Sequence, residues 1–154
     1  MPRGAGQYSG HVPGSRNPPP SSGDVSARMR RVRTRDTEPE VALRRILHAR
    51  GQRYRVDARP EPWLRRRADV VFRREKLAVF VDGCFWHRCP DHGTDPAANG
   101  GWWREKLDAN VSRDRDTDSR LAEAGWTVVR IWEHELPAVA ADRVMEELRM
   151  LRAP

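Results

Sequence analysis

Residues 76–87 read Lys-Leu-Ala-Val-Phe-Val-Asp-Gly-Cys-Phe-Trp-His, and this stretch determines how the rest of the chain is arranged. Apart from Lys76, its first six residues are apolar, a pattern typical of a strand buried on both faces of a sheet. Asp82 and Gly83 end the apolar run. The next four residues combine a thiol, two aromatic rings and an imidazole without helical or strand periodicity. We therefore expect a buried strand over residues 76–81 that leads into a chemically reactive loop.

The segments on either side carry the two patterns that predict strands and helices. Runs rich in β-branched and aromatic residues predict two more buried strands and one short one. Apolar residues that recur every three or four positions predict three helices. In chain order we expect a helix over residues 37–50, strands over residues 52–56, 68–72 and 76–81, a loop over residues 82–101, a helix over residues 102–124, a strand over residues 127–132 and a helix over residues 138–152. This order predicts an α/β fold with a mixed sheet flanked by helices.

The N-terminal residues differ in composition from the rest of the chain. Residues 1–25 are rich in Gly, Pro and Ser and include three consecutive prolines. Because so few apolar side chains cannot offset the entropy lost on ordering, we expect a disordered arm over residues 1–25 and one domain over residues 26–154. The arm lacks the apolar core of a signal peptide, and no later segment approaches the roughly 18 apolar residues of a membrane span. The sequence therefore predicts a cytoplasmic protein.

The charge of the chain points to nucleic acid as a partner. The 29 basic and 22 acidic residues give a formal net charge of +7, and all but two of the basic residues are arginines. Arginine binds phosphate groups through parallel hydrogen bonds, which makes it common in nucleic-acid recognition. Several arginines are concentrated in residues 26–35, so we expect this segment to face phosphates.

Two cysteines and a histidine lie close together in the loop that follows the central strand. Cys84, Cys89 and His92 have the spacing C-x4-C-x2-H, and thiolate and imidazole are the usual ligands of tetrahedral zinc. A fourth ligand is available if the strand over residues 127–132 pairs beside the central strand, because His134 then arrives at the start of the loop. We therefore predict a structural Zn²⁺ site. The alternative is two unrelated thiols near scattered histidines.

Two carboxylates mark neighbouring ends of predicted strands. Asp69 opens the strand over residues 68–72, and Asp82 follows the strand over residues 76–81 after a short hairpin. Phosphodiester hydrolysis needs a divalent cation and carboxylates to hold it. Aspartate is common at strand edges, but acidic residues at the ends of two adjacent strands resemble the core of restriction-type nucleases. The pattern favours a metal-dependent nuclease.

The segment VFVDGCFWH, residues 79–87, resembles the central motif of the very-short-patch-repair (Vsr) DNA mismatch endonucleases. The resemblance extends over residues 29–135 with its spacing preserved. Further matching positions are Met29 and Arg30, residues 34–37, Glu40, Asp69, Trp103, Asn110, Arg113 and Asp114, and residues 125–126 and 132–133. The resemblance implies a restriction-endonuclease-like fold, with a mixed sheet, flanking helices and a structural zinc site.

The resemblance also implies catalytic roles for individual residues. Asp69 matches the family's metal-binding aspartate, and the backbone carbonyl of Val81 matches a second contact to the catalytic Mg²⁺. His87 matches a histidine that activates the attacking water. Glu40 matches a helix glutamate near the water molecules on the metal. Alternatively, Glu40 completes a capping box with Thr37 at the start of the first predicted helix.

The sequence departs from the family's best-known members in two places, with Ala68-Asp69 where they carry Pro-Asp and Val81-Asp82 where they carry Thr-His. Asp82 stands where the best-known members carry a histidine. We expect Asp82 either to add a direct metal ligand or to replace that histidine in the hydrolysis. The predicted zinc ligands, in contrast, fall on or beside the family's structural zinc ligands: Cys84, Cys89, His92 and His134.

The aromatic residues acquire a role through the same resemblance. Phe85, Trp86 and Trp103 match rings that the family inserts into the base stack beside a T·G mispair. Unstacking a step costs on the order of a few kcal/mol, and less where pairing is already imperfect. Met29, with Arg30 beside it, matches a residue that the N-terminal arm wedges into the minor groove. The alternative for Phe85 and Trp86 is burial against the zinc loop.

Taken with the resemblance, the sequence predicts an Mg²⁺-dependent DNA endonuclease that nicks 5′ of the mispaired T in a T·G mismatch. Such mismatches arise by deamination of 5-methylcytosine, so the nick starts very-short-patch repair. A cytosine methyltransferase and a repair polymerase are then its functional partners, and we expect a nucleoid-associated monomer. Two alternatives stay open, namely a restriction-like nuclease of another specificity and a non-catalytic, zinc-stapled DNA-binding module. Asp69 argues against the module, because a carboxylate facing a polyanion weakens binding.

Overall fold

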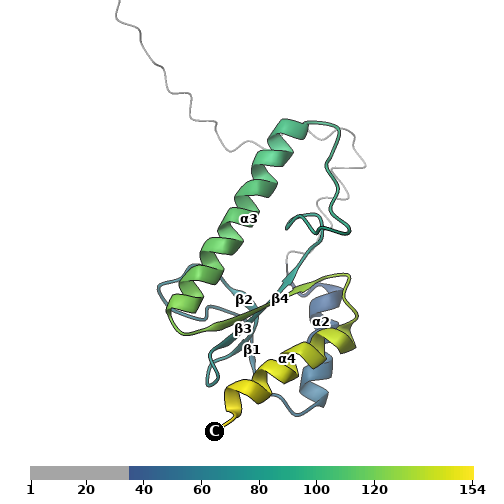
Figure 1. Ribbon diagram of the computed structural model, residues 1–154. Coiled ribbons are helices and arrows are strands. Elements are labelled where there is room, and N and C mark those ends of the chain that lie inside the picture. The colour runs from purple at the N-terminus through teal and green to yellow at the C-terminus, as the bar shows by residue number, and fades with distance from the viewer. Residues whose placement is uncertain (1–34) are drawn as a thin grey trace, which may run out of the picture.

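Seven helices and strands make up the part of the chain that the computed structural model describes, residues 35–154 (Figure 1). In chain order they are α2 (Glu38–Ala49), β1 (Arg55–Ala58), β2 (Ala68–Phe72), β3 (Leu77–Asp82), α3 (Gly100–Glu123), β4 (Thr127–Trp132) and α4 (Pro137–Arg152). The expectations for the arm over residues 1–25 and for Met29 and Arg30 lie outside the described residues.

The four strands form one sheet in the order β1-β2-β3-β4. β2 is antiparallel to both β1 and β3, whereas β3 and β4 are parallel. Two parallel neighbours cannot be joined by a tight turn and need a long crossover, which the 24-residue helix α3 supplies. The predicted mixed sheet with flanking helices is therefore confirmed.

The pairing register brings several chain segments to one edge of the sheet. β3 and β4 are in register from Leu77 opposite Thr127 to Asp82 opposite Trp132, so both strands end at the same level. β2 runs the other way beside β3, so its first residues lie at this level too. The start of β2, the loop after Asp82 and the residues after Trp132 therefore meet at one place, which we call the carboxyl edge.

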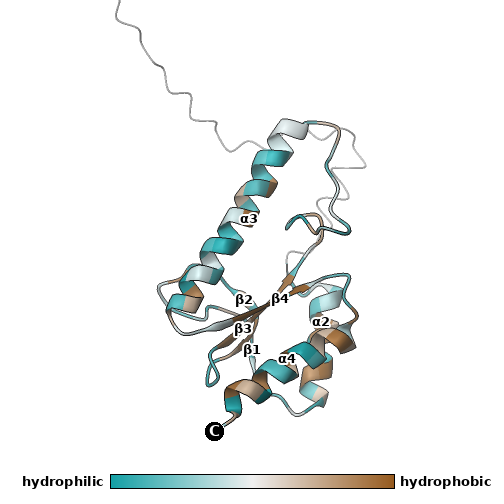
Figure 2. Cartoon of the chain, viewed as in Figure 1, coloured by the Kyte–Doolittle hydropathy of each residue, from teal (hydrophilic) through white to brown (hydrophobic). Residues whose placement is uncertain are grey.

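Two hydrophobic clusters cover the two faces of the sheet. On one face, α2 and α4 pack over the strands through buried side chains such as Leu47 and Leu148. On the other face, Leu121 at the end of α3 and Trp126 just before β4 pack against Phe80. The central strands β3 and β4 are coloured mainly as hydrophobic in Figure 2, whereas most of α3 is hydrophilic. None of the helices within residues 35–154 combines the length and apolar character needed to cross a membrane.

The observed boundaries agree with the predicted ones to within two residues, except for the first strand. That strand covers Arg55–Ala58 and not residues 52–56. Gln52 still belongs to the turn that closes α2, because its N–H donates to the carbonyl of Leu47 (3.0 Å). A hydrogen bond from the preceding helix thus delays the start of the strand.

The predicted capping box at the start of α2 is wrong. Thr37 occupies the N-cap position, but its side chain makes no capping hydrogen bond. Its carbonyl instead accepts a hydrogen bond from the N–H of Val41 (3.0 Å). Glu40 is buried, with 6% of its surface exposed, and its charge acts on Asp69. The side chain of Glu40 is therefore buried near Asp69 and does not cap the helix.

Candidate active site and metal centre

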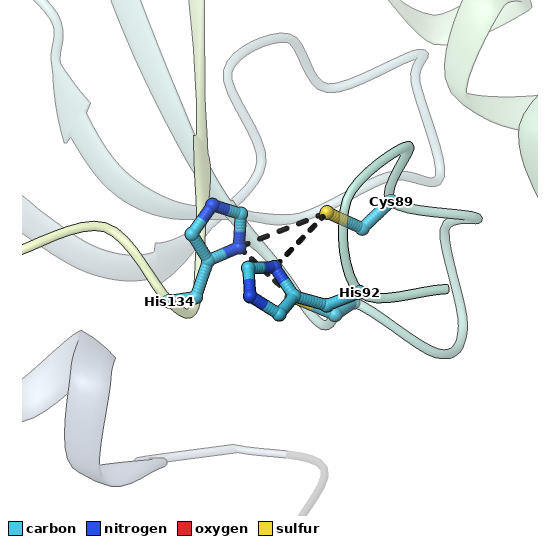
Figure 3. A group of neighbouring side chains, drawn as sticks. Cys89, His92 and His134 are labelled. Atoms are coloured by element: carbon cyan, nitrogen blue, oxygen red, sulfur yellow. Dashed lines mark hydrogen bonds between the residues drawn. The ribbon is translucent and has the colours of Figure 1, made fainter. Parts of the chain in front are cut away.

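Four side chains with metal-binding atoms converge at the carboxyl edge. The ligand atoms of Cys84, Cys89, His92 and His134 all lie within 4.8 Å of one another. The Nδ1 atom of His134 is 3.1 Å from the Sγ of Cys84 and 3.7 Å from the Sγ of Cys89. The Nδ1 atom of His92 is 3.9 Å from the same Cys89 sulfur (Figure 3). The β3–β4 pairing thus brings His134 to the three ligands of the loop, from 42 positions further along the chain than His92.

The spacing and chemistry of these four side chains fit a tetrahedral metal ion. Ligands bound about 2.0–2.3 Å from one ion lie roughly 3.3–3.8 Å from one another, close to the separations found here. Burial raises the pKa of Cys84 to about 11, and the thiol of Cys89 adds to the rise. Because a cation must replace the protons before buried thiols become thiolates, a site of two cysteines and two histidines is suited to Zn²⁺.

The backbone of the loop is shaped for this cluster. The N–H of Cys89 donates to the carbonyl of Cys84 (2.9 Å), and the N–H of Gly93 donates to the carbonyl of Cys89 (2.8 Å). A Cβ atom at Gly93 would lie 2.5 Å from that Cys89 oxygen, so a side chain there would displace the turn. The N–H of Cys84 also donates to the carboxylate of Glu133 (2.9 Å), which ties the loop to the residues after β4.

Asp69 stands at the start of β2, beside the end of β3. Its Oδ2 accepts a hydrogen bond from the N–H of Val81 (2.7 Å). Burial raises the pKa of Asp69 to about 7, the N–H of Val81 opposes the rise, and the charges of Glu40 and Asp82 add to it. Here the negative charge of Asp69 is poorly compensated, which is the electrostatic condition of a site for a cation. The structure therefore brings together Asp69, Val81 and Glu40, three of the residues named from the sequence.

A second group of polar side chains surrounds His87. The Nδ1 atom of His87 lies 2.5 Å from Oδ2 of Asp114 and 3.8 Å from Oδ1 of Asp82. Burial works against the charged form of His87, but the hydrogen bond that its ring donates to Asp114 and the charges of Asp82 and Asp114 outweigh it, so the pKa of His87 is raised. A carboxylate can only accept here, so the Nδ1–H donates to Asp114 and the second ring nitrogen, Nε2, is left as the basic atom.

Asp82 is held by an arginine on the neighbouring strand. Both carboxylate oxygens of Asp82 accept hydrogen bonds from Nη1 of Arg130 in β4 (3.0 and 3.1 Å). Burial raises the pKa of Asp82, while Arg130 and then His87 oppose the rise. Asp82 and Asp69 therefore lie in different electrostatic surroundings, although both stand at the carboxyl edge.

Three aromatic rings from the loop and α3 pack against one another. The ring centroid of Phe85 is 5.1 Å from that of Trp86 and 5.4 Å from that of Trp103. The three side chains are only partly buried, so each keeps some surface in contact with solvent. The carbonyl of Trp86 accepts a hydrogen bond from the side-chain amide of Asn110 (3.2 Å), which fixes the loop against α3. The rings form a cluster that combines mutual packing with exposure.

Two members of the His87 group received no role from the sequence. Asp114 appears in the family resemblance, but nothing in the pattern of a polar helix indicates that it faces a histidine. Arg130 lies in the strand TVVRIW, and a charged residue inside an apolar strand is a signal that could have been used. Its partners are three carboxylates from β3 and α3, and such long-range pairing cannot be read from spacing.

The fold and the site define a nuclease-like α/β protein with a Cys/His cluster beside its carboxylates. The profile of the family "DNA mismatch endonuclease Vsr" matches residues 22–91. The type II nicking enzyme V.NaeI of Lentzea aerocolonigenes is 42% identical over 151 residues, which cover 97% of this chain and 90% of the relative. V.XorIIP, a type II nicking enzyme of Xanthomonas oryzae pv. oryzae, is 37% identical over 73% of this chain and 82% of the relative.

The DNA mismatch endonuclease Vsr of Escherichia coli is 38% identical over 109 residues, covering 70% of this chain and 68% of the relative. These matches show that the chain belongs to the Vsr family of DNA endonucleases. Membership implies the nuclease fold that the sheet and helices display, and it confirms the resemblance found in residues 79–87.

The raised pKa of Asp69 predicts a pH-dependent effect of Asp69→Asn on stability. A carboxyl group with a pKa of about 7 in the folded protein and an ordinary value of 3.8 when unfolded contributes stability that is full below pH 3.8 and lost as the pH rises through 7. Asn stays neutral and can still accept the hydrogen bond of Val81. Asp69→Asn should therefore stabilise the Mg²⁺-free protein by roughly 2–4 kcal/mol at pH 8, and much less at pH 5.

Urea unfolding at the two pH values measures this difference, in Mg²⁺-free buffer without a chelator so that the Cys/His cluster is left undisturbed. Asp142→Asn, an exposed change on α4, is the control and should have little effect at either pH. An equal effect of Asp69→Asn at pH 5 and pH 8 would contradict the electrostatic account of Asp69.

Proposed function

We propose that the protein is an Mg²⁺-dependent endonuclease that nicks one DNA strand 5′ of the mispaired T in a T·G mismatch. The observation that carries this proposal is the position of Asp69, a poorly compensated carboxylate beside the N–H of Val81, at the same sheet edge as a cluster of partly exposed aromatic rings. Such an edge combines a cation site for hydrolysis with surfaces that can enter a base stack.

Asp69, with the backbone carbonyl of Val81, would hold the Mg²⁺, and Glu40 would act on the water molecules around it. The burial of Glu40 and its electrostatic effect on Asp69 support this role over helix capping. A divalent ion at this position supplies charge stabilisation for the attacked phosphate and for the leaving 3′-oxygen. The carboxylate of Asp69 would bind the cation, and that of Glu40 would orient the water molecules around it.

His87 would prepare the attacking water. With its Nδ1–H donated to Asp114, Nε2 can take a proton from water as the oxygen attacks phosphorus. The new P–O bond then forms while the bond from phosphorus to the 3′-oxygen breaks, which leaves a 5′-phosphate and, after protonation, a 3′-hydroxyl. Asp114 keeps the ring in the required tautomer and orientation, as the carboxylate does in other His–Asp pairs.

A structural Zn²⁺ held by Cys84, Cys89, His92 and His134 would fix the loop to the residues after β4. The distances among the four ligand atoms support this assignment. The loop carries the proposed DNA-contacting rings, so a loop fixed at its base presents them with little loss of entropy on binding.

Phe85, Trp86 and Trp103 would insert beside the mispair, where unstacking costs least. Their mutual contacts and partial exposure support a preformed wedge. Met29 and Arg30 would contact the DNA from the N-terminal side. The net charge of +7 supports binding to a polyanion.

The nick would start very-short-patch repair of deaminated 5-methylcytosine. A cytosine methyltransferase would then be a functional neighbour, and a repair polymerase would act on the nicked product. We infer a monomer that works at the nucleoid in the cytoplasm. The family supports this repair role, since the Escherichia coli relative is named as a DNA mismatch endonuclease.

A related nicking enzyme with another preference is the second candidate. The relatives from Lentzea aerocolonigenes and Xanthomonas oryzae are named as type II nicking enzymes, which favours cutting of one strand without naming a mismatch. A non-catalytic DNA-binding module is the third candidate. The partly buried, poorly compensated carboxylate of Asp69 argues against it, because pure binding to a polyanion gains nothing from such a group.

A nicking assay on labelled duplexes tests the proposal. With Mg²⁺, the protein should cut the T strand of a duplex with one T·G mispair 5′ of the T and leave the matched T·A duplex intact. Asp69→Ala should lower the rate at least about a hundredfold, because charge stabilisation of the transition state is lost. Asp142→Ala on α4 should cut like the wild type. Several sequence contexts around the mispair are needed, since flanking bases affect recognition.

Equal cutting of the T·G and T·A duplexes would leave a nuclease without the mismatch role. Tight binding with no cutting of any duplex, across several metals, would favour the DNA-binding module.

Metal analysis tests the Cys/His cluster. Protein purified without chelators should contain about one zinc per chain, because four ligands of the right type converge on one point. Cys89→Ser should lose most of that zinc and unfold at lower temperature, since the ion contributes to folding. His48→Ala, which removes an exposed histidine of α2, should keep both. Wild-type protein that folds without bound zinc after incubation with Zn²⁺ would rule out the structural assignment.

A further inference from the structure

The group of polar side chains around His87 has the composition of a metal site. Single ligand atoms of Asp82, His87 and Asp114 lie within 4.8 Å of one another, and their side chains are between 7% and 26% exposed. Two carboxylates and an imidazole at this spacing are a suitable ligand set for a divalent cation. Besides the Cys/His cluster, residues 35–154 therefore present two further places for a cation at the carboxyl edge, one at Asp69 and one here.

Arg130 places a positive charge inside this second group. Its Nη1 atom lies 3.0 Å from Oδ1 of Asp82 and 3.6 Å from Oδ1 of Asp114. Its Nε and Nη2 atoms donate to the carboxylate of Asp118 in α3 (3.0 and 2.8 Å, respectively), and its guanidinium lies 4.5 Å from the ring centre of Phe80. Arg130 is thus held from several sides, with 22% of its side chain exposed.

A cation among these ligands would meet strong repulsion from that guanidinium. Like charges about 4 Å apart repel strongly even in a partly polar interior, and a divalent cation doubles that repulsion. Asp82 would also have to break two hydrogen bonds with Arg130 to become a ligand. Asp82 is one of the positions where the chain departs from the family's best-known members, and the arginine that binds it lies on the neighbouring strand β4.

We propose that Arg130 is a positioning residue. Its guanidinium occupies the place that a divalent cation would take among Asp82, His87 and Asp114, and it thereby keeps the His87 ring in the orientation that hydrolysis requires. The inference rests on the proposed function for its effect on nicking, but not for its effect on metal binding. Asp82 then serves through Arg130 and not as a metal ligand. The cation needed for hydrolysis is left to Asp69.

Arg130→Gln tests the proposal through two independent measurements. Nicking under single-turnover conditions should slow by roughly 10- to 100-fold, which is typical when a residue that orients a reacting side chain through a hydrogen bond is removed. The apparent affinity for DNA should stay within about twofold, because Arg130 is directed into the protein. Equilibrium Mn²⁺ binding, followed by electron paramagnetic resonance, should show one more bound ion per chain than the wild type, since the ligands lose their internal cation.

Three further variants complete the experiment. Arg130→Lys keeps the charge but not the bidentate geometry, so it should nick at an intermediate rate and bind no extra Mn²⁺. Asp82→Asn combined with Arg130→Gln should be no slower than Arg130→Gln alone, because the two residues act as a unit. Arg50→Gln breaks an exposed pair with Asp142 and should match the wild type in both measurements.

A folded Arg130→Gln protein that nicks at the wild-type rate, or that binds no additional Mn²⁺, overturns the proposal. If Arg130→Gln does not fold, Arg130→Lys decides, and a wild-type rate in that variant overturns it. If the wild-type protein nicks none of the duplexes, the proposed function fails, and the Mn²⁺ count alone then supports or overturns the role of Arg130.

Discussion

The parallel pairing of β3 with β4 is the constraint on which the site depends. Because the two strands end in register at Asp82 and Trp132, the residues that follow them start from the same level of the sheet. Cys84 consequently meets His134, and Arg130 lies beside Asp82. A shift of this register by one residue would turn Arg130 to the opposite face and separate both pairs. The crossover through α3, which also carries Asp114 and Trp103, is what makes a parallel pair possible.

The acidic residues at the carboxyl edge fall into two groups, those without an arginine partner among residues 35–154 and those paired with Arg130. Glu40 is buried and Asp69 is partly buried, and their charges lack a balancing arginine among the interactions described above. Asp82, Asp114 and Asp118 share Arg130. Burying uncompensated charge costs stability, and proteins retain it where a ligand supplies the opposite charge. This contrast, more than the identity of the residues, suggests which carboxylates receive a cation and which only orient their neighbours.

Much of this arrangement can be predicted from the sequence, because it depends on local patterns. The apolar runs at residues 68–72 and 127–132 define two strands with their observed ends, and the spacing of Cys84, Cys89 and His92 marks the cluster. What could not be predicted depends on side chains far apart in the chain. The contacts of Arg130 with three aspartates result from the packing of α3 against the sheet. Glu40 does not form the predicted capping box, and its side chain is buried near Asp69.

The central claim is that the catalytic cation binds at Asp69 and not among Asp82, His87 and Asp114. Iron-mediated cleavage of the polypeptide tests it most directly. Fe²⁺ replaces the catalytic ion, and ascorbate with hydrogen peroxide then generates radicals that cut the backbone beside the bound metal. We predict cuts near Asp69, Val81 and Glu40, suppressed by Mg²⁺ and absent in Asp69→Asn. Cuts that centre on Asp114 and persist in Asp69→Asn would contradict the account.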